Sequence, residues 1–285
     1  MRKPFQVVTR FSVVAFMTLA LTGCPDPQPD CRTEELWPCI EREGLLEGAT
    51  PSQVNSDFIA FGDSISVGGK CISTCGFING LEAATGKKVA NFGIAGHMAH
   101  NEVDGWELWG EYKEPYWRVE QSIAFNPTAT RAYVHIGGND LIDCRFGDSP
   151  PAACHEILWP DDPPVCTMDA SVEGYMASIT NKVKLIVQHY KNNDISDVYL
   201  LSPAQIDPDC PAIVLMVPNE GERLCIDPII LALRDALRAV ALEEGISFVD
   251  LSSDEGLIGR HCLNDCIHID CQGFALVLED ILAAH

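Results

Sequence analysis

Serine, histidine and aspartate residues stand in this chain at places that suit nucleophilic hydrolysis. Ser64 follows Gly62-Asp63 at the end of a short apolar run, and Asp265 and His268 stand close together near the C-terminus. A serine hydroxyl is a poor nucleophile unless a histidine lies within hydrogen-bond reach and an acid orients that histidine. Because an Asp-x-x-His segment can offer both groups from one loop, these residue types favour attack by a serine on an acyl group.

Two glycine-containing segments could complete such a site. They are Asn91 to Gly96 and Gly137 to Asp140. A tetrahedral intermediate needs hydrogen-bond donors aimed at its oxyanion, and glycine N–H groups and an asparagine amide meet that need. Each segment alone also has a structural explanation. The Asp and Ser after Gly62 suit a turn with a helix cap, residues 137–140 suit a turn with positive φ, and Asp265 with His268 suits a surface pair.

Short apolar runs alternate with helical patterns from about residue 56 onward, which predicts how these segments are positioned. Strands are expected at 57–61, 88–92, 131–136, 198–201 and 246–251, and helices at 71–85, 101–124 with a break near Pro115, 171–192, 229–244 and 273–284. This alternation predicts a parallel sheet with helices on both faces. Right-handed crossovers put all strand carboxyl ends at one edge, where open α/β sheets bind ligands. The chemical segments follow the first three strands and the fifth.

The four segments, in this order, resemble blocks I, II, III and V of the SGNH (GDSL-type) hydrolases. The resemblance covers roughly residues 56–275 and implies a flavodoxin-like three-layer α/β/α sandwich with a five-stranded parallel sheet. It implies a catalytic triad of Ser64, Asp265 and His268. It also implies an oxyanion hole formed by the N–H groups of Ser64 and Gly96 and the side-chain amide of Asn139. No metal and no cofactor are expected.

The segments depart from the family pattern at a few positions. Ile65 replaces the usual leucine after the serine, and Gly138 replaces the commoner threonine before Asn139. His97 follows Gly96, so the hydrogen bonds around the oxyanion loop are expected to differ. His97, His100 and His135 are otherwise expected to be polar surface residues or satisfied interior ones.

The resemblance implies a serine esterase that acts on short acyl or O-acetyl esters, including those on carbohydrate. A lipase or thioesterase of the same family, and a non-catalytic surface carbohydrate-binding protein on the same scaffold, remain alternatives. An α/β-hydrolase is disfavoured because no Gly-x-Ser-x-Gly segment occurs. Four aromatic residues could form a sugar-stacking platform, although their near-helical spacing favours core packing: Trp106, Trp109, Tyr116 and Trp117.

The N-terminus has the pattern of a targeting segment. Residues 1–23 combine basic residues with an apolar stretch, and Leu21 to Cys24 resemble the lipobox of bacterial lipoproteins. This predicts a lipoprotein signal peptide over 1–23, acylation of Cys24, a Pro-rich spacer over 24–54 and a hydrolase domain over 55–285. The protein would then be periplasmic or at the cell surface, held to a membrane through its lipid. An ordinary signal peptide or a short apolar anchor are the alternatives.

Cysteine usage fits an exported protein. The chain has 13 cysteines, and setting aside Cys24 leaves an even number suited to pairing. Disulfides are expected to brace loop insertions at 143–168 and 203–228 and to fix the loop of Asp265 and His268. A zinc site formed by His261, Cys262, Cys266 and His268 is the disfavoured alternative, because the spacing is unusual for zinc.

Charge and hydropathy exclude two broad classes. The 285 residues include 41 acidic and 19 basic ones, for a net charge of −22, which argues against a nucleic-acid partner. Removal of 1–23 would take away three cations and make the net charge −25. No apolar run reaches the roughly 20 residues of a membrane-spanning helix, which excludes a polytopic membrane protein. The expected partner is a small-molecule or polysaccharide ester.

Overall fold

The computed structural model describes seven segments of the chain, residues 54–66, 76–94, 96–108, 111–141, 170–205, 226–252 and 269–285. They contain a five-stranded parallel sheet in the order β2-β1-β5-β6-β7. Its strands are β1 (Phe58–Gly62), β2 (Val89–Gly93), β5 (Arg131–His135), β6 (Asp197–Leu201) and β7 (Ser247–Val249). Counted along the chain, this order is 2-1-3-4-5, the flavodoxin-like arrangement. The expected fold class is confirmed.

The central strands form where the sequence predicts them because they are covered on both faces. Every residue of β1 and β2 is buried, although the two strands include a polar side chain, Asn91. Parallel strands packed between two helical layers have continuous apolar runs instead of an alternating pattern. The strand predictions are therefore accurate to within one or two residues, except that β7 ends earlier than expected.

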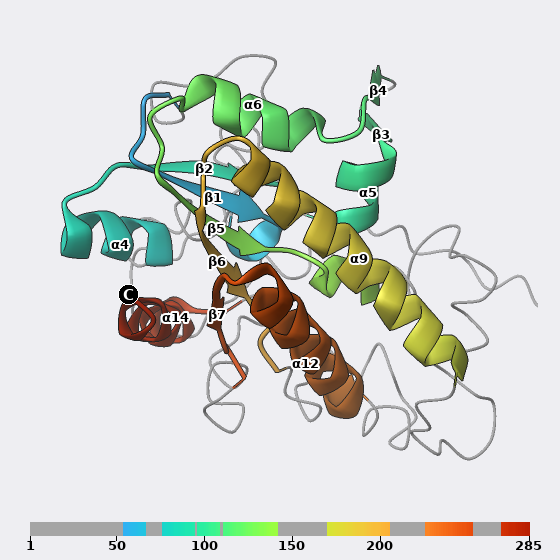
Figure 1. Cartoon of the computed structure of the whole chain (residues 1–285). Coiled ribbons are helices and arrows are strands. Elements are labelled where there is room, and N and C mark those ends of the chain that lie inside the picture. Colours follow the sequence, from blue (N-terminus) through green and yellow to red (C-terminus); the bar gives the residue numbers. More distant parts are fainter. Residues whose placement is uncertain are drawn as a thin grey trace, which may run out of the picture.

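Helices cover the sheet on both faces, as Figure 1 shows. On one face lie α4 (Phe77–Thr85) and α14 (Cys271–Ala283), which pack against each other through contacts such as Phe77 with Phe274. The other face carries α6 (Trp117–Phe125), α9 (Ala170–Asn192) and α12 (Ile226–Glu244). Two separate clusters of buried apolar side chains fill the two interfaces. The three-layer arrangement is thus confirmed.

The helix expected over residues 171–192 is confirmed as α9, and its buried side chains share one face. The buried side chains of this helix are Met176, Ile179, Val183, Ile186, Val187 and Tyr190, with Thr180 beside them. They lie on one stripe because residues three and four apart share a helix face. This stripe packs on the sheet and on α12.

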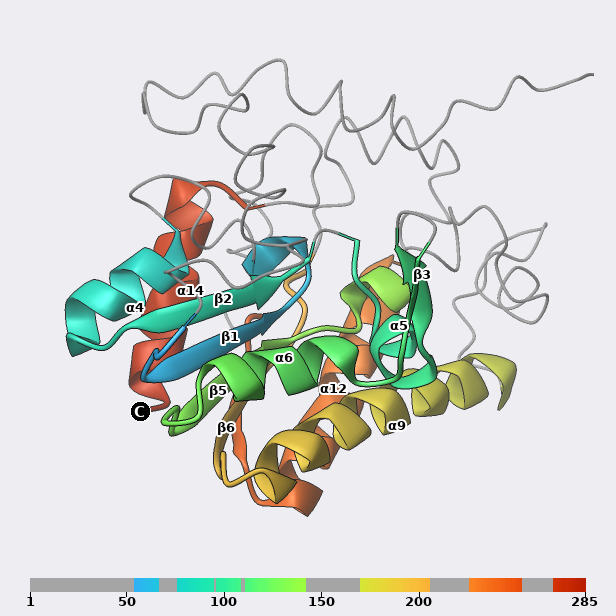
Figure 2. The same cartoon turned by 90° about the horizontal axis from the view of Figure 1, so that it is seen from above.

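The helix expected over residues 101–124 is wrong in its middle part. The structure has a short helix α5 (Ala99–Asp104), then an antiparallel hairpin of β3 (Trp106–Leu108) and β4 (Glu111–Lys113), and only then α6. Gly105 ends α5 with a φ of 80°, a left-handed conformation that favours glycine. A β-carbon there would lie 2.2 Å from the Tyr112 hydroxyl. Figure 2 shows α5 and the hairpin beyond the carboxyl ends of β1 and β2.

Several predictions fall on residues outside the described segments. They concern the signal peptide, the spacer, Cys24, most of the two loop insertions, Asp265, His268 and the four residues of the zinc alternative. Cys271 is disulfide-bonded, and the other cysteines lie outside the described residues, so disulfide bracing stays a prediction. Within the described segments, every helix is too short or too polar to cross a membrane.

Candidate active site

Three of the four predicted segments meet at the carboxyl edge of the sheet. β1 lies between β2 and β5, and Gly62 is in register with Gly93 on one side and His135 on the other. Ser64 follows β1 by two residues, Gly96 follows β2 by three, and Asn139 follows β5 by four. Ser64 and Asn139 are half-buried, and Gly96 is exposed. The fold therefore brings these three predicted residues to one place, while Asp265 and His268 lie outside the described residues.

The turn that carries Ser64 is fixed by Asp63. The Oδ1 atom of Asp63 accepts a hydrogen bond from the backbone N–H of Ile65 at 3.0 Å and one from Nδ1 of His135 at 3.1 Å. The Asp63 N–H in turn donates to the His135 carbonyl. At Gly62 a β-carbon would lie 1.9 Å from that same carbonyl oxygen, so only glycine allows β1 and β5 to approach this closely.

The pair of Asp63 and His135 is buried beneath this turn. Burial by itself lowers the pKa of His135, but the charge of Asp63 and its hydrogen bond outweigh that effect. Backbone hydrogen bonds at His135 and Ser202 act in the same direction as Asp63. The net result is a pKa of His135 above its usual value, which favours an imidazolium–carboxylate pair next to the predicted nucleophile.

Asn91 ties the serine turn to the neighbouring strand. Its side-chain amide donates to the Ser66 carbonyl at 3.0 Å, and its Oδ1 accepts from the N–H of Gly93 at 2.9 Å. The Asn91 side chain is fully buried. The residue that begins the second predicted segment therefore supports the first segment, a contact that the sequence alone did not indicate.

The loop after β2 places Gly96 in an open position. Gly96 has a φ of 76°, and a β-carbon there would find no atom within 4 Å. The conformation, not crowding, is thus what favours glycine at this residue. The next residue, His97, donates its backbone N–H to the Ile94 carbonyl and so closes the turn. Its own carbonyl accepts a hydrogen bond from the Asn139 side chain at 3.2 Å.

Asp140 joins the loop after β5 to the start of α5. Its carboxylate accepts hydrogen bonds from the backbone N–H groups of Ala99, at 2.9 Å, and His100, at 3.2 Å. The Nδ1 atom of His100 binds the same carboxylate, which is fully buried. Asp140 therefore caps α5 from forty residues away, and it holds the segments of Gly96 and Asn139 together.

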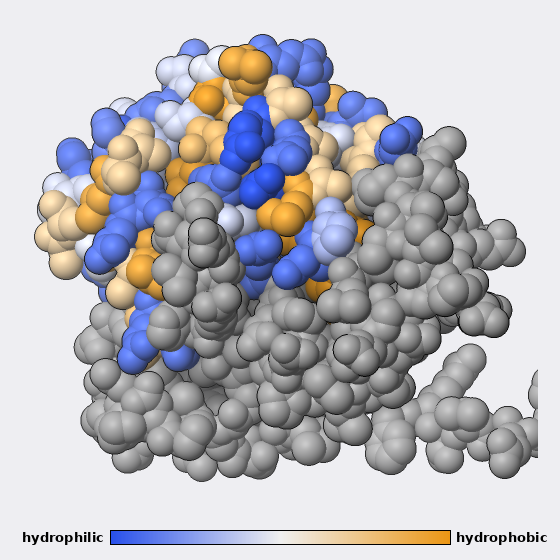
Figure 3. Space-filling model, turned by 90° about the horizontal axis from the view of Figure 1, so that it is seen from below, coloured by the Kyte–Doolittle hydropathy of each residue, from blue (hydrophilic) through white to orange (hydrophobic). Residues whose placement is uncertain are grey.

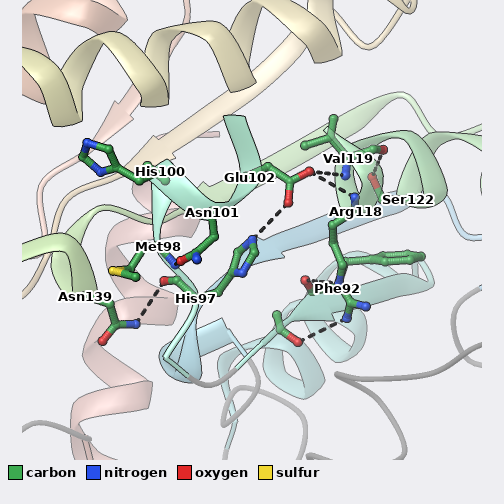
Figure 4. Close-up of polar contacts among 12 residues, drawn as sticks. Phe92, His97, Met98, His100, Asn101, Glu102, Arg118, Val119, Ser122 and Asn139 are labelled. Carbon is green, nitrogen blue, oxygen red and sulfur yellow. Dashed lines mark hydrogen bonds and ion pairs between the residues drawn. The ribbon is translucent and has the colours of Figure 1, made fainter. Parts of the chain in front are cut away.

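A second buried network lies behind the Gly96 loop, and Figure 4 shows it in close-up. Glu102 on α5 accepts hydrogen bonds from the His97 ring and from the backbone N–H groups of Arg118 and Val119. The Arg118 side chain extends to the carbonyls of Phe92 and Gly93 at the end of β2. Burial lowers the pKa of Arg118 to about 10, while the charge of Glu102 opposes that shift, so the guanidinium stays protonated at neutral pH.

The histidines were expected to be surface or satisfied interior residues. His97 and His135 are indeed interior residues with carboxylate partners, and His100 is partly exposed and paired with Asp140. Each of the three contacts a segment of the candidate site. The signal that could have found them was their position within one to four residues of the predicted segments.

The aromatic residues near the second segment do not all pack as expected. Tyr116 stacks on His189 with ring centroids 4.7 Å apart, and the Lys113 ammonium lies 4.9 Å above the Trp117 ring. Both Tyr116 and Trp117 are half-buried and lie outside the two apolar clusters of the described residues. Core packing, which the spacing favoured, is therefore wrong for these two side chains.

Comparisons with known proteins identify the family of the chain. The sequence profile of the GDSL-like Lipase/Acylhydrolase family matches residues 60–273. No curated protein matches the chain.

Solved structures share the fold at low sequence identity. An acetyl xylan esterase, AlAXEase, superposes with a TM-score of 0.53 at 16% identity, covering 80% of this chain and 98% of that one. Phospholipase A1 from Streptomyces albidoflavus NA297 superposes with a TM-score of 0.52 at 16% identity, and the match covers 81% of this chain and 100% of that one. A carbohydrate acetylesterase family member from Sinorhizobium meliloti superposes with a TM-score of 0.52 at 12% identity, and the match covers 79% of this chain and 94% of that one.

Proposed function

Since the chain belongs to the GDSL-like lipase/acylhydrolase family and is a serine hydrolase, we propose that it hydrolyses carboxylic esters from the hydroxyl of Ser64. The observation that supports this role is the convergence of the Ser64, Gly96 and Asn139 segments at the carboxyl edge of β1, β2 and β5. In our proposal His268 is the general base and Asp265 orients it.

The first half of the reaction acylates the enzyme. The Oγ atom of Ser64 attacks the acyl carbon while His268 takes the hydroxyl proton, and the carbonyl oxygen becomes an oxyanion. The N–H groups of Ser64 and Gly96 and the amide of Asn139 donate hydrogen bonds to that oxyanion. The tetrahedral intermediate collapses, and the alcohol leaves with the proton from His268.

The second half releases the acid. Water attacks the acyl carbon, His268 takes the water proton, and the same three donors stabilise the second oxyanion. The bond to Ser64 then breaks, and the serine regains its proton from His268. Asp265 keeps the imidazole in one tautomer throughout and stabilises the imidazolium.

We propose short acyl esters, including O-acetyl groups on carbohydrate, as the substrates. Two of the similar structures are described as an acetyl xylan esterase and a carbohydrate acetylesterase family member, which supports this class. The similar structure of a phospholipase A1 favours the second candidate, a lipase of the same family. The acyl chain length separates the two, because a pocket that fits acetyl excludes a long chain.

The test combines a fluorophosphonate probe with a series of p-nitrophenyl esters from acetyl to palmitoyl. We expect Ser64→Ala to abolish both labelling and turnover. Ser66→Ala, a change two residues along the same turn, should keep both. Asn139→Ala should lower kcat by about 100- to 1,000-fold, the usual loss for one oxyanion donor, while the protein stays folded.

The outcomes separate the candidates. The highest kcat/KM at acetyl supports the short-acyl esterase, and a maximum at long chains supports the lipase. Turnover by Ser64→Ala at the wild-type rate would refute the proposed mechanism. Probe labelling that persists in Ser64→Ala would assign the nucleophile to another residue.

We also propose that the protein is exported and anchored through an acylated Cys24. The proposal rests on the resemblance of residues 21–24 to a lipobox and on the high cysteine content. Metabolic labelling with a palmitate analogue tests it. Label on the wild type and its loss in Cys24→Ala are expected, and an unlabelled wild-type protein contradicts the anchor.

A further inference from the structure

We propose that Glu102 is a positioning residue, which holds two oxyanion donors in place through His97. The inference rests on the proposed function, because it concerns the Gly96 N–H and the Asn139 amide as donors. Neither Glu102 nor His97 touches the reacting atoms in this proposal. Their role is to fix the loop that carries the donors.

Glu102 connects two elements with one buried carboxylate. Its Oε1 atom accepts the backbone N–H groups of Arg118 at 3.0 Å and Val119 at 2.9 Å, which are free of helical partners at the start of α6. Its Oε2 atom accepts Nε2–H of His97 at 3.0 Å. Both members of the pair have fully buried side chains, so the solvent does not weaken the interaction.

His97 connects that carboxylate to both donors. Its imidazole is held by Glu102, and its backbone N–H closes the turn onto Ile94. It is bonded to Gly96 by the peptide bond, and its carbonyl accepts one N–H of the Asn139 amide. The second N–H of that amide can then donate to the oxyanion. A shift of His97 would therefore move the two donors together.

Arg118 connects the Glu102 network to the end of β2, where the loop that carries Gly96 begins. Its Nε atom donates to the Phe92 carbonyl at 3.3 Å, and the guanidinium lies 5.6 Å from the Phe92 ring. The loop of Gly96 starts one residue after β2 ends. The buried cation thus balances the charge of Glu102 and ties α6 to the end of that strand (Figure 4).

This arrangement does more than fill space. Apolar residues of similar volume fill a protein interior at least as well as a buried charge network does. Oxyanion donors, in contrast, contribute only when they are aimed before the charge develops, and a misplacement of about 1 Å can lower the rate about 100-fold. The contact between the Glu102 carboxylate and the His97 imidazole holds the two donors in the required direction.

The experiment compares Glu102→Ala with Glu120→Ala, an exposed acid on α6 as the matched control. Active sites are counted with the fluorophosphonate probe, and kcat and KM are measured for p-nitrophenyl acetate. Glu102→Ala should lower kcat by about 10- to 100-fold with little change in KM. Affinity for a boronic acid, whose adduct with Ser64 is tetrahedral, should fall in proportion. Glu120→Ala should match the wild type.

A double variant separates positioning from a merely structural role. If Glu102 acts through the donors, its loss should matter less once one donor is gone. Glu102→Ala combined with Asn139→Ala should then be faster than the product of the two single effects predicts. Effects that multiply, or a loss confined to the number of active sites, would overturn the inference.

A conservative variant keeps the test available if Glu102→Ala does not fold. Glu102→Gln retains an acceptor for the two backbone N–H groups of α6, but it replaces the carboxylate that His97 contacts and removes the charge that Arg118 balances. A lower kcat that combines less than multiplicatively with Asn139→Ala supports the inference, and an unchanged kcat overturns it. Turnover by Ser64→Ala would instead indicate failure of the proposed function, so the two failures are distinguishable.

Discussion

Buried carboxylates organise the backbone at each described segment of the candidate site. Asp63 binds the turn of Ser64, Asp140 caps α5, and Glu102 binds the start of α6. Each carboxylate forms a hydrogen bond with at least one backbone N–H group and another with a histidine ring nitrogen. A buried carboxylate is costly unless such donors satisfy it, and the donors in turn lose their freedom to move. These acids therefore fix the loops that carry the proposed oxyanion donors.

The sequence could indicate some of these residues and not others. Asp63 directly precedes Ser64, and Asp140 directly follows Asn139, so a search for the motifs of the predicted catalytic residues includes both aspartates. Glu102 lies sixteen residues from its partner Arg118, and their contact depends on how α5 and α6 pack. No local pattern encodes that packing. The roles of Asp265 and His268 still rest on the sequence motif.

The pair of His135 and Asp63 predicts a pH-dependent contribution to stability. The pKa of His135 is raised in the fold, against about 6.5 in the unfolded chain. Its stabilising effect is then fully present below about pH 6.5 and is lost as the pH rises through the raised value. We expect His135→Gln to lower the free energy of unfolding more at about pH 6 than at about pH 9, as measured by urea denaturation.

The partner supplies the control for this prediction. Asp63→Asn removes the charge that raises the pKa of His135, while burial still lowers it, so the effect of His135→Gln should no longer be larger at about pH 6 than at about pH 9 in that background. An equal effect of His135→Gln at both pH values in the otherwise unchanged protein would contradict the ion pair. The comparison needs no assumption about catalysis.

Among the helices and strands, the sequence predicts the strands that helices bury on both faces, and it misses the short hairpin whose position depends on turns. The runs that form β1, β2 and β5 are apolar because helices cover both faces of the sheet. The region of the β3–β4 hairpin has a spacing of aromatic residues that also fits a helix, and the sequence pattern predicts a break only near Pro115. Short strands next to a helix are thus difficult to separate from it.

The start of α14 gives a prediction at this scale. The Asp270 side chain accepts hydrogen bonds from the N–H groups of Gln272 at 2.8 Å and Gly273 at 2.9 Å. Asp270, two residues after His268, is therefore the N-cap of α14 and sets where the helix begins. Asp270→Ala should lower the free energy of unfolding by about 1 kcal/mol, measured by urea denaturation.

Asparagine separates the cap from other effects at this position. Asp270→Asn keeps an acceptor for the two N–H groups and should change the free energy of unfolding by a few tenths of a kcal/mol, roughly, because Asn and Asp cap about equally well. A loss as large as that of the alanine variant would mean that the charge, and not the capping hydrogen bonds, stabilises this end of α14.

At the scale of the molecule, the fold tolerates great sequence change. The similar structures share about one residue in six with this chain, yet they superpose over most of it. Layers of helices on a parallel sheet need apolar residues of suitable volume, not particular ones. The parallel sheet with helices on both faces was therefore predictable, whereas the buried networks behind Gly96 depend on individual side chains that no apolar pattern indicates.

Net charge is the property of the whole molecule that bears on its substrates. The chain carries −22, and on the face drawn in Figure 3 polar and apolar residues of the described part are interspersed. Such an excess of acid repels anions over distances set by the Debye length, about 30 Å at 0.01 M salt and about 8 Å at 0.15 M. Neutral esters approach without this repulsion.

Salt should therefore accelerate the hydrolysis of anionic esters alone. We expect kcat/KM for a p-nitrophenyl hemisuccinate ester to rise by roughly 2- to 10-fold between these two salt concentrations, because screening removes the repulsion. The neutral p-nitrophenyl acetate is the matched control, and its kcat/KM should stay the same. A rise common to both esters would indicate a change in the enzyme itself. Salt independence of both would show that local charge at the site outweighs the charge of the whole molecule.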